Sequence, residues 1–105
     1  MIAAPKSNFR AFRAVANQEA AEALALRALA YVIEDPERAS RFLGVTGLAG
    51  TDLAAQLDNA AFLGGVLDFV LEDDTLLESV AGAADLPPEA IRFARRQLPG
   101  LTIEG

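Results

Sequence analysis

Two long apolar runs, each followed at once by an acidic turn, constrain the fold of this chain more than any other feature of its sequence. The first run ends at 33-IEDPE-37 and the second at 71-LEDDT-75. Neither run shows the alternation of apolar and polar residues that is typical of a half-buried strand. A helix that is apolar on most sides is usually buried at the centre of a domain. The pattern therefore predicts an all-α fold with these two helices in the middle.

Local start and stop signals divide the chain into six predicted helices. Asn17, Asp35, Thr51 and either Asp73 or Asp74 are suited to N-cap positions, where a short polar side chain accepts a hydrogen bond from the first turn. Pro99-Gly100 is a stop signal. The result is a compact six-helix bundle with helices over about residues 18–34, 36–43, 52–57, 60–72, 74–84 and 88–98.

The second half of the chain repeats the order of the first. With an offset of 38 residues, 28-ALAYVIEDPERASRFLGVTGLAGTDLAA-55 aligns with 66-VLDFVLEDDTLLESVAGAADLPPEAIRF-93. Each half has an apolar helix, an acidic cap, a second helix that ends near a glycine, and a third helix. We therefore expect a basic N-terminal tail over residues 1–16 and one helical domain over 17–105. The domain would consist of two pseudo-repeated three-helix units, about 17–57 and 58–100.

The residue types that most often carry chemistry are absent, since the chain has no His and no Cys. It thus lacks the usual general base near neutral pH, the commonest metal ligand, and the thiolates of zinc sites. The chain has three serines, Ser7, Ser40 and Ser79. None of them lies in a motif that would supply the general base needed to activate a serine nucleophile. We therefore expect no enzyme activity, no metal site and no cofactor.

The charge of the chain disfavours nucleic acid as a partner. The formal net charge is −6 at pH 7, which opposes non-specific binding to phosphates. The segment 42-FLGVTGLAGTDL-53 has the look of a helix-turn-helix corner. However, Gly47 and Gly50 interrupt it and Asp52 places negative charge where a phosphate would lie.

Three arginines near the end of the chain are the candidate partner-binding residues. Arg92, Arg95 and Arg96 have the i, i+3, i+4 spacing that places side chains on one helix face. Such a face suits an acidic protein or a phosphate. The alternative is a solvated face whose charges complement the helix dipole.

Two charges and two glycines interrupt the apolar runs. Arg27 and Asp68 either pair with each other or each reach a polar edge of its helix. A pocket lined by both would indicate an enzyme or a small-ligand carrier. Gly64 and Gly65 are candidates for close helix packing, with a dimer contact or a ligand slot as the alternative.

No membrane span is expected, because the most apolar run, 60-AAFLGGVLDFVL-71, is too short to cross a bilayer and contains Asp68. Residues 1–16 lack the continuous apolar stretch of a signal peptide. We therefore expect a cytoplasmic protein.

Three segments carry a resemblance to a known family: 27-RALAYVIEDPERASRFLGVTGL-48, 62-FLGGVLDFVLEDDTLL-77 and 84-ADLPPEAIRFARRQLPG-100. From about Glu19 to Gly100 the chain resembles a family of short bacterial proteins classed as a domain of unknown function. The resemblance implies a bacterial cytosolic helical domain and supplies no site residues. Taken together, these features lead us to expect a non-catalytic protein-interaction module or a homodimer. A nucleic-acid- or transcription-associated factor that uses the basic face of the last helix is the alternative.

Overall fold

The computed structural model describes residues 11–100, and this part of the chain is helical without any strand. The all-α prediction is therefore confirmed for these residues. The elements are α2 (Gln18–Glu34), α3 (Pro36–Thr46), the 3-10 helix η1 (Gly50–Asp52), α4 (Leu53–Gln56), α5 (Ala60–Leu71), α6 (Asp74–Ala84) and α7 (Pro88–Arg95).

Each of the six predicted helices has a counterpart, but the count of six does not describe the structure. Residues 11–14 add a further helical turn, and the third predicted helix is divided into η1 and α4. The last predicted helix stops early, at Arg95. Residues 96–98 continue with tighter bonds from each N–H to the carbonyl three residues back, as is common at helix ends.

Most of the predicted caps are confirmed, because they depend on local geometry. Asn17 Oδ1 accepts the N–H of Ala20 at 2.8 Å, and Asp35 Oδ2 accepts that of Arg38 at 2.9 Å. The prediction for Thr51 is wrong, since this residue lies inside η1. The carboxylate of Asp52 instead accepts the N–H of Ala49, at 3.4 Å.

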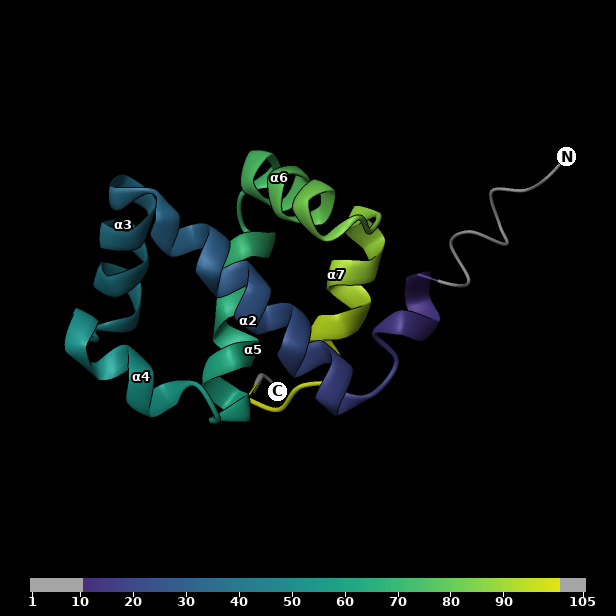
Figure 1. Ribbon diagram of the computed structural model, residues 1–105, viewed down its shortest axis with the longest axis horizontal. Coiled ribbons are helices and arrows are strands. Elements are labelled where there is room, and N and C mark those ends of the chain that lie inside the picture. The colour runs from purple at the N-terminus through teal and green to yellow at the C-terminus, as the bar shows by residue number, and fades with distance from the viewer. Residues whose placement is uncertain (1–10, 101–105) are drawn as a thin grey trace, which may run out of the picture.

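The two apolar helices form the centre of the molecule, as predicted. Figure 1 shows α2 lying across α5, with α3 and α4 on one side of the crossing and α6 and α7 on the other. Phe42 of α3 is fully buried and meets the rings of Phe62 and Phe69 edge-on, at centroid distances of 6.0 and 5.2 Å. Such pairs add specific geometry to a core that is otherwise aliphatic.

The prediction that the first apolar helix is buried on most sides is wrong for its outer face. Leu24, Leu29 and Val32 lie in the core, whereas Leu26 is 38% and Ile33 is 44% exposed. The helices α3, α5, α6 and α7 all contact α2, yet these contacts leave Leu26 and Ile33 partly in water. The described helices thus leave one apolar side of α2 without a cover.

The two predicted units have different surroundings in the structure. The third helix of the second unit, α7, packs on α2, α5 and α6, whereas η1 is the main contact of α4. The second helices also end differently, because Gly47 takes the left-handed conformation after α3 and Asp85 takes it after α6. The duplication therefore stays a prediction.

The predicted N-terminal tail lies partly outside the described residues, which begin at residue 11. Within the described part, the ring of Phe12 packs on that of Phe93 at a centroid distance of 5.4 Å. Val15 is 3% exposed and belongs to the core. The end of this segment thus docks on α7 and on the body of the domain.

Candidate functional site

The outer face of α2 carries four apolar residues in a line. Ala23, Leu26, Ala30 and Ile33 follow one another at alternating spacings of three and four residues, and this spacing keeps side chains on one side of a helix. All four are exposed. We call these four residues the outer strip. A surface helix normally places polar or charged residues at such positions, so the strip is unusual for a face in contact with water.

Two opposite charges border the outer strip on the same edge. Arg27 follows Leu26 and Glu34 follows Ile33, and a spacing of seven residues returns a helix almost to the same angle. Both side chains are exposed. No hydrogen bond or ion pair joins either of them to another residue of the described 11–100 segment. Both charges are therefore available to a molecule that covers the strip.

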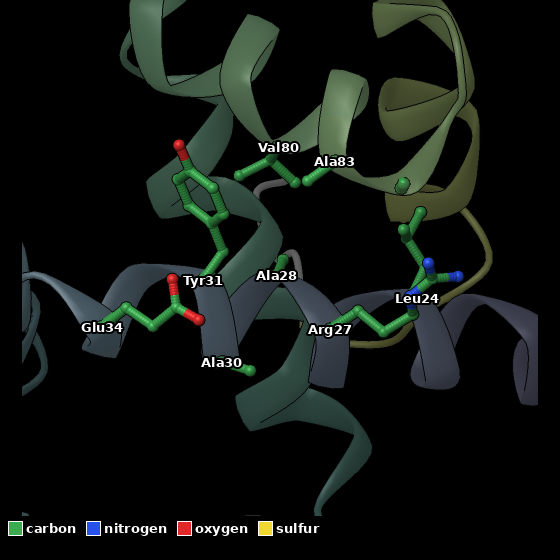
Figure 2. Close-up of a pocket in the computed structure, with 9 residues that line it drawn as sticks. Leu24, Arg27, Ala28, Ala30, Tyr31, Glu34, Val80 and Ala83 are labelled. Atoms are coloured by element: carbon green, nitrogen blue, oxygen red, sulfur yellow. The ribbon is translucent and has the colours of Figure 1, made fainter.

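A shallow hollow lies between this edge of α2 and the second half of α6 (Figure 2). Its volume is about 200 Å³, and Leu24, Ala28 and Val80 are among its apolar lining residues. A second hollow of about 250 Å³ shares Leu24 and Arg27 with the first and extends toward the residues that precede α2. Pockets for small molecules usually measure about 300–1,000 Å³, so each hollow alone is small for such a ligand.

One residue of α3 contacts the tyrosine at one end of the first hollow. Figure 2 shows Tyr31 and Glu34 at one end and Arg27 at the other. The guanidinium of Arg38 lies over the Tyr31 ring at 4.7 Å and donates a hydrogen bond to the Tyr31 carbonyl at 2.9 Å. A cation over an aromatic face is an attractive contact, and it fixes the tyrosine side chain against the α2–α3 corner.

A buried arginine at the end of α7 is bound to a carboxylate of α5. Arg95 is 5% exposed. Its Nε donates to Asp68 Oδ1 at 2.7 Å and its Nη2 to Asp68 Oδ2 at 3.2 Å. The Nη1 group donates to the carbonyls of Leu98 at 3.0 Å and Pro99 at 3.4 Å. The planar fork of the guanidinium suits this two-oxygen contact, and it ties the end of α7 to α5.

The three candidate partner-binding arginines are not brought together on one exposed face. Arg92 and Arg96 are exposed, whereas Arg95 is buried against Asp68. Successive residues turn by about 100° along a helix, so Arg95 and Arg96 point to clearly different sides. Arg96 also lies over the Phe93 ring at 5.5 Å. The sequence spacing alone could not separate the inward arginine from the outward two.

Arg27 and Asp68 are likewise placed apart. Asp68 binds Arg95, and its side chain is 43% exposed. Arg27 is exposed on α2 and lines both hollows. Neither hollow includes Asp68 among its lining residues. Neither of these two hollows therefore has the arrangement expected for an enzyme or a small-ligand carrier, with Arg27 and Asp68 in one pocket.

The two adjacent glycines of α5 also differ. A Cβ atom at Gly64 would lie 2.9 Å from the Pro99 carbonyl oxygen and 3.0 Å from Cζ of Arg95. A Cβ atom at Gly65 would meet nothing within 4 Å. The close approach therefore takes place at Gly64, between α5 and the segment that follows α7.

The sequence contains a spacing signal for the outer strip, but the same residues also fit the buried face of a central apolar helix. Leu26 and Ile33 are seven residues apart, with Ala23 and Ala30 completing an a/d pattern. Because α2 is apolar almost all round, this line could not be distinguished from its buried neighbours before the packing was known.

Within residues 11–100, no group of three acidic side chains is placed to hold a metal ion. None of the described helices is long and apolar enough to cross a membrane.

Comparison with known families gives one finding. A family model described as "Protein of unknown function (DUF3572)" matches residues 18–101, which confirms the resemblance to a domain of unknown function. No curated protein and no solved structure gives a significant match to the chain.

Proposed function

The chain belongs to the DUF3572 family of proteins of unknown function, and we propose, from its surface, that it is a non-catalytic protein-interaction module. The contact surface is the outer face of α2, which consists of the outer strip together with Arg27 and Glu34. A partner helix laid on this face would cover the strip and meet both charges.

The exposure of Leu26 and Ile33 is the observation that carries this proposal. The two side chains are 38% and 44% exposed and lie in line with two exposed alanines. Single exposed apolar residues are common on protein surfaces, whereas a contiguous apolar patch with a polar rim is typical of interaction sites. The shape also fits, since a straight line of apolar residues at a/d spacing is the surface that another amphipathic helix covers.

The nucleic-acid alternative has less support. The charge of Arg95 is compensated by Asp68, which leaves Arg92 of α7 and Arg96, directly after α7, as the exposed arginines of this segment. The net charge of −6 would also weaken binding to a phosphate backbone.

Site-specific photo-crosslinking tests the proposal. A photoreactive benzoylphenylalanine replaces Leu26 in one variant and Val45 in the control variant, and both are irradiated in nuclease-treated lysate of the native cell. Val45 of α3 is 70% exposed and apolar, so it reports contacts that depend on exposure alone. We expect a discrete protein adduct from position 26 that is absent from position 45. Identical adduct patterns at the two positions would contradict the proposal.

A further inference from the structure

We propose that the partner of the outer strip is a second copy of the same chain, with the two α2 helices packed antiparallel across a twofold axis. This inference rests on the proposed function, because it names the molecule that covers the same surface. Two properties of α2 support the inference: the sizes of the strip residues and the charges beside them. Both favour the same alignment of the two helices.

The alternation of large and small side chains selects an antiparallel register. When two copies of α2 run in opposite directions with Leu26 opposite the partner's Ala30, Ile33 lies opposite the partner's Ala23. Every layer then contains one large and one small side chain, so the contact is filled evenly and the helices can approach closely. A parallel pair would instead place Ala opposite Ala and Leu opposite Leu. Layers with two small side chains would then alternate with layers with two large ones along the contact.

The charges on the strip's edge fit the same register. In the seven-residue repeat of the strip, Leu26 and Ile33 take the second apolar position. The residues that follow this position in two antiparallel helices lie beside one another along the contact. Arg27 of each copy then faces the partner's Glu34, so that two ion pairs form around the axis. A parallel pair would instead bring Arg27 to the partner's Glu22 and would leave Glu34 near the partner's Leu29, which is 4% exposed and belongs to the core. The antiparallel pair is therefore the one that satisfies both exposed charges.

The size of the surface predicts a weak and reversible dimer. In this register α2 overlaps its copy from about residue 22 to residue 34, little more than three helical turns. Stable complexes bury about 1,200–2,000 Å² of surface, and smaller interfaces are typical of transient association. We therefore expect a dissociation constant in the micromolar range and a monomer–dimer equilibrium that shifts with concentration.

Charge reversal tests the register in solution. Sedimentation velocity of the purified full chain over a micromolar to millimolar series gives the dissociation constant of each variant. Arg27→Glu and Glu34→Arg each replace two attractive pairs with two repulsive ones, and we expect each to weaken dimerisation about tenfold. The double variant restores opposite charges in both pairs and is expected to return within about threefold of the wild type. The antiparallel register would be overturned by a different pattern. In that pattern Arg27→Glu weakens dimerisation, Glu34→Arg leaves it unchanged, and the double variant does not restore it.

Cysteine cross-linking gives an independent reading, because the chain has no Cys of its own. Ala23→Cys and Ile33→Cys are oxidised separately and as an equimolar mixture. Equivalent positions in an antiparallel pair are ten residues apart along the axis, about 15 Å, whereas a disulfide spans about 7 Å between Cα atoms at most. We expect a covalent dimer in the mixture and little from either variant alone. A dimer formed by Ala23→Cys alone would indicate parallel helices and overturn the proposal.

The failure of this inference and the failure of the proposed function can be told apart. A wild-type chain that stays monomeric through the millimolar range, with no cross-link in the cysteine mixture, overturns the second copy as partner. If the photoreactive residue at position 26 then forms an adduct with a different protein, the proposed interaction function is supported, and that protein is the partner that covers the outer strip. If that position also yields no specific adduct, both proposals fall. Circular dichroism of every variant checks that the fold is retained, as expected for substitutions at exposed positions.

Discussion

At the scale of single residues, Gly64 and Gly65 show how strongly the surroundings of two consecutive helix positions can differ, because each step along a helix turns the chain by about 100°. Gly64 is buried, with the Arg95 guanidinium and the Pro99 carbonyl so close that a methyl group would overlap them. Gly65 faces open space on the same helix. Glycine costs about 1 kcal/mol relative to alanine within a helix. At Gly64 this cost is offset by the close packing, whereas at Gly65 nothing in the described structure requires a glycine.

We therefore expect opposite results from two neighbouring alanine substitutions. Gly64→Ala should lower the free energy of unfolding by about 1–3 kcal/mol, because the backbone carbonyl of Pro99 must shift to admit the methyl group. Gly65→Ala should raise it by up to about 1 kcal/mol through better helix propensity. Urea denaturation followed by circular dichroism measures both values. Equal effects at the two positions would contradict the close approach at Gly64.

At the scale of elements, Arg95 fastens the end of α7 and the residues after it to α5. One guanidinium binds the Asp68 carboxylate and the two carbonyls that follow α7. Gly100 then continues in the left-handed region at φ 98°, and a Cβ atom there would meet Ala61 at 3.2 Å. The chain after α7 thus lies against the first turns of α5.

Three alanine variants along α7 separate this structural arginine from its neighbours. Arg95→Ala should cost about 2 kcal/mol of unfolding free energy. A fully buried pair would cost about 3–5 kcal/mol, but water can rehydrate the half-exposed Asp68 once its partner is gone. Arg92→Ala and Arg96→Ala remove exposed side chains and should change stability by less than about 0.5 kcal/mol. Thermal and urea denaturation of the three variants provide the comparison. Similar losses in all three would mean that the ion pair does not fasten α7.

At the scale of the whole molecule, the outer strip of α2 is separate from the residues that stabilise the fold. The inner side of α2 packs on α5, and the residues there are nearly inaccessible to water. The outer side makes no comparable contact within the described residues, and its large side chains stay partly in water. One helix therefore supplies both the centre of the core and the proposed interaction surface.

Substitutions on the two sides of α2 should consequently have different effects. We expect Leu26→Glu combined with Ile33→Glu to change the free energy of unfolding by less than about 0.5 kcal/mol, as for other exposed positions, while abolishing the association proposed above. Leu29→Ala, on the inner side, should cost about 2–5 kcal/mol. Denaturation at low micromolar protein concentration keeps association out of the measurement. A loss from the double variant as large as that from Leu29→Ala would show that the strip supports the fold.

Most helix starts were determined by the sequence itself, because their signals are local. The end of α3 was predicted three residues early, since the expected helix stopped at residue 43 whereas α3 continues through Gly44 to Thr46 and ends at the left-handed Gly47. Asn17 and Asp35, by contrast, accept hydrogen bonds from backbone groups three residues ahead. Such contacts lie within one helical turn, so neighbouring residues are enough to predict them. The central place of α2 and α5 was also predictable, since their apolar composition permits burial.

Only the tertiary structure decided which side of each helix faces water. Arg95 is buried because Asp68, 27 residues away, lies beside it, and nothing in the local spacing of the α7 arginines distinguishes it from Arg92 or Arg96. Leu26 and Ile33 are exposed because no described helix packs over that side of α2. The sequence of an almost wholly apolar helix permits burial on any side. The arrangement of its neighbours determines which side remains uncovered, and here that side carries the proposed contact surface.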